Sequence, residues 1–354
     1  MKVLVINPGS TSTKLAIYND SQQIWKHGIY HQPEELKDFQ NINEQYQYRR
    51  DCITKALQGV CDLKELDGII GRGGLLKPMP GGVYRVTERI KEDLKNAKMQ
   101  HASNLAGLLA DELGSIAGCP AFIADPVVTD EMWEIARPTG MTEIERISIF
   151  HALNSRAVSR NYAKEIGKRY EDLNIIVAHL GGGITVSAHQ HGRVVDVNDG
   201  LNGEGPFSPE RAGTIPAAQL AELCFSGKYT LAEIKKKLIG QGGLMAHLGT
   251  TNTQLILEKA AAGDKKCQSI MDAMHYAIAK QIGAMHVTMK GKTDAIIITG
   301  GIAHNEATIV SLKDWVGYLA PIVVVPGEDE LGALAMNAIG ALKGELPLQE
   351  YNPK

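Results

Sequence analysis

Three glycine-rich turns are the first places in this sequence where chemistry could occur, and each follows an apolar run. The first spans Asn7 to Lys14 and reads Asn-Pro-Gly-Ser-Thr-Ser-Thr-Lys. Its glycine lets a ligand approach the main chain, its hydroxyl groups add hydrogen-bond donors, and Lys14 adds a cation. This combination suits a polyphosphate. A serine- and threonine-rich hairpin loop explains the same composition equally well.

The second and third turns contain consecutive glycines. Gly181, Gly182 and Gly183 follow His179, and Gly300 and Gly301 precede Asn305. Consecutive glycines cost conformational entropy, which a close approach of phosphate or ribose to the backbone commonly offsets; a tight bulge is the alternative. Neither a Walker A motif nor the glycine fingerprint of dinucleotide-binding folds occurs in the sequence. Three such turns at strand ends are more informative together than any one alone.

Charged residues also stand where apolar runs end. Arg72 lies between two glycines, in a setting that suits a clamp for a carboxylate. Asp125 precedes a proline and could orient a nucleophile or a metal, although a cap or turn explains it too. Arg211 lies in a loop that could close over a phosphoryl group. His189 and His191 have metal-ligand spacing but no third ligand nearby, so we predict a solvated hairpin tip.

These residues need an α/β framework that places strand ends beside them. The pattern predicts strands at 2–6, 14–18, 66–70, 120–124, 175–178, 184–188, 193–197, 294–299 and 322–325. Helical spacing covers 33–58, 88–114, 146–169, 217–225, 230–238, 253–262, 267–289 and 329–342. A strand–turn–strand unit occurs twice, with starts about 170 residues apart. The repeat suggests two similar α/β domains with a cleft between them.

Composition excludes several classes of function. The chain has 354 residues, 44% of them apolar and 22% charged, with a net charge of −3, so it has no broad basic field for nucleic acid. Its five scattered cysteines include no C-x-x-C pair, which is typical of reduced thiols. No apolar run approaches the ~18 residues that a membrane span requires. We therefore expect a cytoplasmic protein with no membrane partner.

Six motifs in order resemble the acetate and butyrate kinase family, part of the actin, hexokinase and Hsp70 fold group. They are V-I-N-P-G-S-T-S-T-K at 5–14, I-F-H at 149–151, A-H-L-G-G-G at 178–183, P-E-R-A-G-T-I-P at 209–216, I-T-G-G-I-A-H-N at 298–305 and P-G-E-D-E-L at 326–331. The resemblance implies two ribonuclease-H-like domains, residues 1–145 with the last helix from about 331 to 354, and residues 146–330. It also implies an active site in the interdomain cleft and a homodimer.

The resemblance implies a role for each matching residue in phosphoryl transfer from ATP, with Mg²⁺, to a short-chain carboxylate. Metal binding falls to Asn7 with an acidic residue, by direct match Asp329, with Glu330 and Glu328 as alternatives. The other implied roles are phosphate contacts for Ser10, Ser12, Lys14, His179, Gly181, Gly182 and Gly183, adenosine contacts for Gly300, Gly301 and Asn305, carboxylate binding for Arg72, and catalysis for Asp125, His151, His179 and Arg211.

The preferred acid is a separate question. Acetate kinases have a bulkier residue where this chain has Gly74, so we expect extra room for methylenes, with Phe150 as a second pocket wall. Butyrate or a branched acid is therefore predicted, giving butanoyl phosphate and ADP reversibly. The alternatives are an acetate or propionate kinase, a sugar kinase of the same fold group, a non-catalytic actin- or Hsp70-like nucleotide switch, and a regulator that has lost catalysis.

Overall fold

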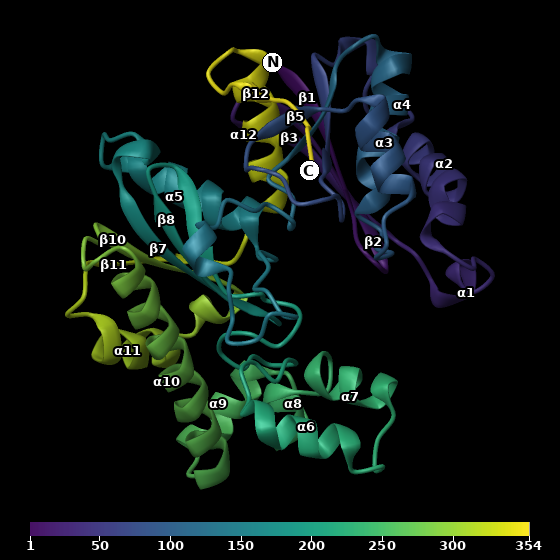
Figure 1. Cartoon of the computed structure of the whole chain (residues 1–354). Helices are drawn as coiled ribbons and strands as arrows, with labels where there is room; N and C mark the ends of the chain where they lie inside the picture. Colours follow the sequence, from purple (N-terminus) through teal and green to yellow (C-terminus); the bar gives the residue numbers. More distant parts are fainter. Residues whose placement is uncertain (354) are drawn as a thin grey trace. The chain divides into compact units, whose positions relative to one another are not determined.

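The computed structural model describes residues 1–353 and forms two compact α/β units (Figure 1). Unit 1 contains Met1–Asp130 and the segment that begins at Asp329, and unit 2 contains Glu131–Glu328. Residues 131–145, which the sequence assigned to the first domain, thus lie in unit 2. Several hydrogen bonds attach them there; among these, Val194 N donates to Glu131 Oε2 (2.7 Å), and Trp133 N donates to Val195 O (2.9 Å).

Unit 1 is built on a seven-stranded sheet in the order β12-β5-β6-β4-β1-β2-β3. Its strands are β1 (Lys2–Pro8), β2 (Ser12–Asn19), β3 (Gln22–Tyr30), β4 (Gly68–Arg72), β5 (Val83–Arg85), β6 (Ala121–Ala124) and β12 (Leu348–Gln349). The first three form an antiparallel meander, and β4 and β6 run parallel to β1. Residues 3–6 of β1 are fully buried, as expected of a strand covered on both faces.

Helices cover both faces of this sheet. They are α1 (Pro33–Leu36), α2 (Gln45–Leu57), α3 (Glu88–Lys95), α4 (Asn104–Ala117) and α12 (Glu330–Leu342). Along β4, a Cβ on Gly68 would meet Leu342 of α12, whereas a Cβ on Gly71 would meet the main chain of Ala106 in α4. Because the two glycines are three residues apart on a strand, α12 and α4 pack on opposite faces.

Unit 2 is built on a five-stranded sheet in the order β11-β10-β7-β8-β9. Its strands are β7 (Asn174–Leu180), β8 (Ile184–Gln190), β9 (Arg193–Val197), β10 (Ala295–Gly300) and β11 (Ile322–Pro326). Its helices are α5 (Ala152–Glu165), α6 (Ala217–Phe225), α7 (Leu231–Leu238), α8 (Gly243–Leu248), α9 (Thr253–Ala261), α10 (Lys265–Thr288) and α11 (Glu306–Val316). An antiparallel meander followed by two parallel strands repeats the core of unit 1, so the predicted duplication is confirmed.

The predicted helices differ from the structure mainly at their starts. The helix expected over 88–114 is two helices, α3 and α4, separated by residues 96–103. The helix expected from 146 begins at Ala152, because residues before it pair with other segments: Arg146 N donates to Arg137 O and Gly200 N to Ile149 O. Helices α8 and α11 and the short strands β5 and β12 were not predicted.

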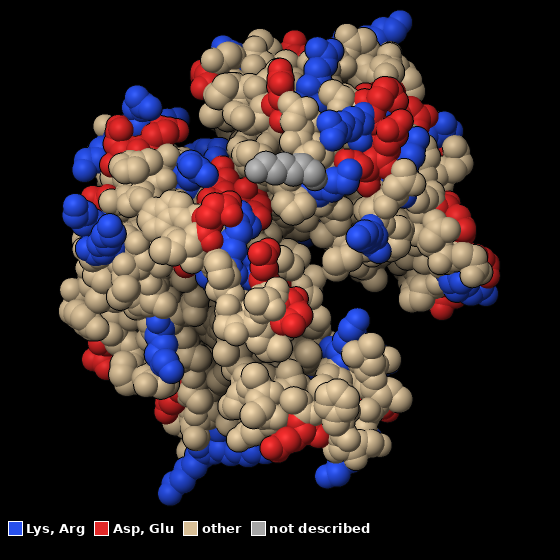
Figure 2. Space-filling model, in the orientation of Figure 1, with Lys and Arg blue, Asp and Glu red and all other residues tan. Residues whose placement is uncertain are grey.

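Charges are mixed on the surface, and acidic and basic side chains are interspersed over the face drawn in Figure 2. Within residues 1–353, none of the helices combines the length and apolar character that crossing a bilayer demands.

His189 lies inside unit 2, so the prediction of a solvated hairpin tip is wrong for this residue. Strand β8 continues to Gln190, and the tip is formed by His191 and Gly192, both with positive φ. The His189 ring is fully buried, with Nδ1 2.6 Å from the Tyr170 hydroxyl and Nε2 2.8 Å from the Ser187 hydroxyl. Burial, reinforced by Arg156 and Arg160, lowers the pKa of His189 to about 3.

This burial predicts a specific loss of stability in acid. Since the folded pKa lies below the unfolded value of about 6.5, the unfolded chain binds an extra proton between these values. Stability linked to His189 is therefore complete above about pH 6.5 and falls as the pH drops towards 3. Between pH 7 and pH 5 the loss should be about 2 kcal/mol. Chemical denaturation of wild type and His189→Gln at both pH values measures it, and equal losses in the two proteins would contradict the assignment.

Candidate active site

Three predicted residues of unit 1 come together where parallel strands end. Strand β1 pairs in parallel with β4, with Ile6 beside Gly71, and β4 pairs with β6, with Arg72 beside Ala124. Asn7, Arg72 and Asp125 therefore follow one another along the same edge of the sheet. The carboxyl edge of an open α/β sheet is where ligands commonly bind.

Glu330, the first residue of α12, connects two of these side chains. Its Oε2 accepts a hydrogen bond from Asn7 Nδ2 (2.8 Å), and its Oε1 lies 2.6 Å from Arg72 Nη1. The position suits a carboxylate, because the N-terminus of a helix favours negative charge. Asp329, which matches the motif directly, instead caps α12 by accepting from Gly332 N (2.9 Å). Of these two acidic residues, Glu330 is therefore the one bound to Asn7.

Asp125 is held in a strained, buried conformation. Its φ of 40° lies in the left-handed region, and its side chain is nearly fully buried. The main chain of Gly82 fixes it from both sides, since Gly82 N donates to Asp125 Oδ1 (2.7 Å) and Asp125 N donates to Gly82 O (3.0 Å). Strain of this kind in a residue other than glycine often marks a functional position.

The first glycine turn connects β1 to β2. Gly9 N donates to Ser12 O (2.7 Å), Ser10 and Lys14 are exposed, and Ser12 is half-buried. Asn7 and Lys14 are directly opposite in the antiparallel register, so their side chains share one face of the sheet. The main chain of this turn is also bound by Arg49 of α2, which sequence reasoning missed. The one feature of the sequence that could have indicated Arg49 is its helical spacing with Ile53 and Leu57, because these three residues form the buried stripe of that helix.

The two residues predicted to shape the acid pocket are in packed surroundings. A Cβ on Gly74 would lie 2.6 Å from Asn104 Cα and 2.8 Å from Leu94 Cδ2, so Gly74 allows α4 to pack and leaves no room for methylenes there. The Phe150 ring is 3% exposed and packs with Met132 and Val197. The predicted pocket role of Gly74 therefore does not fit this geometry, and Phe150 offers little surface to a ligand.

In unit 2, the two predicted histidines stack on each other. The rings of His151 and His179 have centroids 3.7 Å apart and planes inclined by 9°. His151 is the N-cap residue of α5, and its Nδ1 lies 2.9 Å from Thr185 Oγ1. His179 belongs to β7 and is nearly fully buried. Two residues 28 positions apart in the sequence therefore form one stacked pair of imidazole rings.

A chain of donors orients His179. Thr299 Oγ1 donates to Gly327 O (3.0 Å) and accepts from Asn154 Nδ2 (3.2 Å), and the same amide nitrogen lies 2.9 Å from His179 Nδ1. An amide nitrogen can only donate, so Nδ1 accepts and the proton of a neutral ring is on Nε2. This Nε2 lies 3.6 Å from Glu328 Oε2. Neutral His179 therefore presents its Nε2–H donor on the side of the ring away from its contact with Asn154.

Arg211 is a second donor in unit 2, with a half-buried side chain whose Nη2 lies 3.9 Å from Glu210 Oε1. Its Nη1 donates to Gly200 O, and its Nε is buried and has no partner among the described residues. Burial lowers the pKa of this guanidinium, while Glu210 and Asp199 oppose the effect. A Cβ on Gly183 would overlap Arg211 Nη1, so a side chain at this position would displace the guanidinium. An unused buried donor beside a glycine turn suits an anionic ligand.

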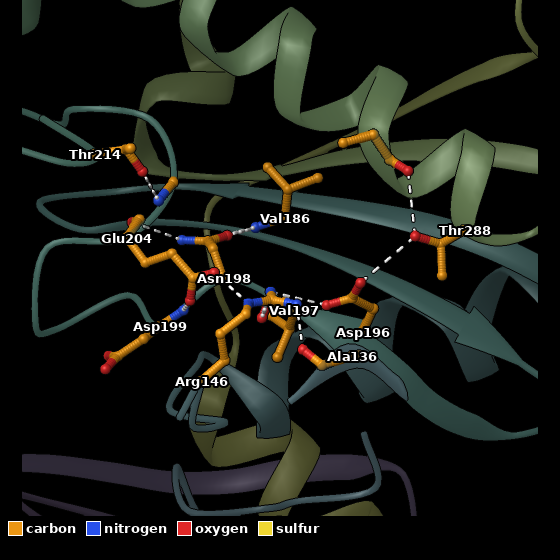
Figure 3. A network of polar contacts seen from close by, with 12 residues as sticks. Ala136, Arg146, Val186, Asp196, Val197, Asn198, Asp199, Glu204, Thr214 and Thr288 are labelled. Atoms are coloured by element: carbon orange, nitrogen blue, oxygen red, sulfur yellow. Dashed lines mark hydrogen bonds and ion pairs between the residues drawn. The ribbon is translucent and has the colours of Figure 1, made fainter. Parts of the chain in front are cut away.

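The loop that carries Arg211 is attached to β9 by the polar network drawn in Figure 3. Arg146 donates to Glu204 Oε1 (2.5 Å), pairs with Asp196 (2.9 Å), and also donates to the carbonyl oxygens of Ala136 and Val197. Further bonds in the same loop run from Asp199 N to Glu204 Oε2 (2.8 Å) and from Gly205 N to Thr214 Oγ1 (2.9 Å). This network fixes the main chain on which Gly200 and Arg211 depend.

The third glycine turn lies beside the second. Strands β7 and β10 are parallel neighbours with His179 opposite Thr299, so both turns are at one edge of the sheet. Gly300 has φ 89°, and a Cβ would strike the main chain of Leu180. Asn305 has a structural task, because it caps α11 by accepting from Thr308 N (3.1 Å) and donates to Gln254 Oε1 (3.1 Å). Gly301 is exposed, and the adenosine contacts stay a prediction.

Comparison with known proteins gives consistent results. The model of the acetokinase family matches residues 134–316. The chain is 60% identical over 354 residues to a probable butyrate kinase of Phocaeicola vulgatus, covering 100% of both chains. It is 48% identical over 352 residues to butyrate kinase 1 of Clostridium acetobutylicum, covering 99% of each.

Solved structures show the same fold at low sequence identity. An acetate kinase of Porphyromonas gingivalis has a TM-score of 0.79 at 19% identity, over 96% of this chain and 99% of that one. A propionate kinase of Francisella tularensis has a TM-score of 0.72 at 19% identity, over 95% and 98%. A ROK family protein of Streptococcus pneumoniae has a TM-score of 0.55 at 14% identity, over 97% and 100%. The predicted actin-like fold class is confirmed by this set.

The donor chain around His179 predicts its tautomer. In wild type, the neutral ring should carry its proton on Nε2, whereas Asn154→Asp should move it to Nδ1, because a carboxylate can only accept there. Two-dimensional ¹⁵N–¹H correlation spectra of histidine-labelled protein distinguish the tautomers, with His179→Asn used to assign the signal. A wild-type spectrum with the proton on Nδ1 would contradict the arrangement.

Proposed function

Because the chain belongs to the acetokinase family, we propose that it catalyses reversible transfer of the γ-phosphoryl group of ATP to the carboxylate of butyrate or a branched short-chain acid. The products are butanoyl phosphate and ADP. The observation that carries this proposal is the full-length identity of 60% and 48% to proteins named probable butyrate kinase and butyrate kinase 1.

Arg72 of unit 1 is proposed to bind the substrate carboxylate. A guanidinium has five N–H donors in a fork that matches a carboxylate, and the Glu330 contact engages Nη1. A carboxylate is already nucleophilic, so the reaction needs little general-base help and depends on orientation. Asp125, fixed at the neighbouring strand end, is proposed to act beside it in the catalytic set.

The histidine pair and Arg211 of unit 2 are proposed to stabilise the transferring phosphoryl group. Charge on its three equatorial oxygens is what such a site must neutralise. His179 offers an Nε2–H donor, and Arg211 offers a cation whose Nε has no partner within residues 1–353. Both are held before any ligand arrives, which is the condition under which electrostatic stabilisation is most effective. His151 is proposed to support this arrangement by stacking on His179.

ATP binding is proposed at the glycine turns. Gly181, Gly182 and Gly183 would present main-chain groups to the phosphates, as would the turn with Ser10, Ser12 and Lys14, and Gly300, Gly301 and Asn305 would lie at the adenosine. The absence of side chains at Gly183 and Gly300 already serves tight packing, so substitution there would disturb structure and binding together.

A magnesium ion is proposed to accompany ATP, held by Asn7 and Glu330. No three acidic, histidine or cysteine side chains gather as a metal cage in the part of the chain that the structure describes. Mg²⁺ nevertheless fits, because it commonly takes only one or two carboxylates and completes its shell with water and phosphate oxygens. When bound, it supplies positive charge to the phosphates. Asp329 is less suited than Glu330, since its Oδ1 already caps α12.

The preferred acid and the oligomeric state are the finer parts of this proposal. Acetate or propionate remains the alternative substrate, since the solved acetate and propionate kinases share this fold at 19% identity. We further propose a cytoplasmic homodimer.

A hydroxamate assay tests the reaction directly. With ATP and Mg²⁺, acyl phosphate formation should be greatest for butyrate or isobutyrate among acetate, propionate, butyrate, isobutyrate and isovalerate. Arg211→Lys should lower kcat by about 10²–10³-fold, as expected for losing a preorganised donor to the transition state. A maximum at acetate would change the proposed substrate. A folded, ATP-binding protein that makes no acyl phosphate from any of these acids would overturn the proposed reaction.

Substitution of Gly74 tests what that position does. Gly74→Val should destabilise unit 1 by about 1–3 kcal/mol, because the new side chain meets Asn104 and Leu94. The ratio of butyrate to acetate activity should stay unchanged in the folded fraction. Thermal unfolding and the acid series measure the two effects, with Gly59→Val as a control at a glycine that has nothing within 4 Å. Because Gly59 has φ 73°, that control reports backbone strain without crowding. A variant as stable as wild type that favours acetate would restore Gly74 as a pocket residue.

A further inference from the structure

Arg49 is a fully buried cation directly beneath the first glycine turn. It extends from α2, and every acceptor of its guanidinium is neutral. Nη1 donates to Gly9 O (3.0 Å), Ser12 O (3.4 Å) and Thr13 Oγ1 (3.1 Å), and Nη2 donates to Ser10 O (3.1 Å). Nε donates to Gln45 Oε1 (3.0 Å). One side chain thus holds three carbonyl groups and one hydroxyl of the same turn.

No carboxylate neutralises this charge. Within residues 1–353 Arg49 forms no ion pair, and the polar contacts of its guanidinium include no carboxylate. Burial lowers the pKa of the guanidinium, but arginine stays protonated in proteins. A buried cation without a partner is costly and normally finds an opposite charge. Among residues 1–353, no carboxylate is bound to the Arg49 guanidinium, so its positive charge is not neutralised by an ion pair.

His31 keeps the surroundings neutral. Its Nε2 lies 2.9 Å from Thr13 Oγ1 and its Nδ1 lies 3.1 Å from the Tyr48 hydroxyl. Thr13 accepts from Arg49 and can therefore donate its own proton to His31 Nε2. Burial first, and then the Arg49 cation, lowers the pKa of His31 to about 4 against an opposing effect of Glu35, so this ring is uncharged at neutral pH.

The carbonyl contacts also fix the direction of the turn. In a trans peptide the C=O of one residue and the N–H of the next point to opposite sides. With Gly9 O and Ser10 O bound to Arg49, the N–H groups of Ser10 and Thr11 face away from it. Successive N–H groups on one side of a turn form an anion-binding surface.

We infer that Arg49 is a positioning residue for the polyphosphate of ATP, an inference that rests on the proposed function. It holds the carbonyl groups of the turn on the buried side, so that N–H and hydroxyl groups face the ligand. Its uncompensated charge adds positive potential from below, and the phosphates supply the missing anion. Lys14, which is exposed on β2, is a separate cation of the same turn.

Substitution on α2 separates this role from general stability. Arg50 is the matched control, because it is the next residue of the helix, half-buried, and paired with Asp51 and Glu112. Arg49→Met should raise KM for ATP about tenfold or more, which corresponds to about 1.4 kcal/mol of binding. KM for butyrate should change less than about twofold, a ratio worth about 0.4 kcal/mol. Arg49→Lys, which keeps the charge but loses the fork, should fall between wild type and Arg49→Met, and Arg50→Met should match wild type.

The outcomes are distinguishable. Equal changes in both KM values, or an unchanged KM for ATP in folded Arg49→Met, would overturn the inference and leave the proposed function intact. If wild type forms no acyl phosphate, the proposed function fails, and the Kd for ATP, measured by calorimetry on the same variants, still decides the role of Arg49. If Arg49→Met does not fold, Arg49→Lys carries the test, and a KM for ATP equal to that of wild type counts against it.

Discussion

In each unit, the parallel pairing of the first meander strand with its neighbour determines where the candidate residues lie. In unit 1 the pairing of β1 with β4 brings Asn7 next to Arg72, and in unit 2 the pairing of β7 with β10 brings the second glycine turn next to the third. A shift of register by one residue would turn each side chain to the opposite face of its sheet. The fully buried apolar runs prevent such a shift, so packing far from the site secures its chemistry.

Three arginines, one buried and two half-buried, differ in what holds their guanidinium groups. Arg146 pairs with the carboxylates of Asp196 and Glu204, which neutralise its positive charge. Arg49 is held by neutral oxygens, which orient its guanidinium without cancelling its charge, whereas Arg211 combines a bond to the carbonyl oxygen of Gly200 with the more distant carboxylate of Glu210, 3.9 Å from its Nη2. Both of the latter lie under glycine turns. A cation held by neutral acceptors, as Arg49 is, would give the proposed phosphate-transfer site a positive field before the nucleotide binds.

The sequence predicted strand ends and turns well, because an apolar run that stops at glycine or proline has a local cause. Contacts between residues far apart in the sequence have no local cause. The stacking of His151 on His179 and the bonds of Arg49 to a turn 40 residues away could therefore not be deduced. The interpretation of Gly74 failed for a different reason. A glycine in a sequence shows that a side chain is missing, whereas only the backbone shows that its Cβ would point into α4.

The position of α12 has a consequence for how the chain is made. Unit 2 is continuous in sequence, from Glu131 to Glu328, whereas unit 1 needs Leu331, Leu334 and Ala338 of α12 to cover its sheet. During synthesis from the ribosome, the first strands to emerge therefore wait for one of the last helices, while the middle of the chain can already fold by itself. The unit whose strands are translated first is therefore completed last, once α12 has been synthesised.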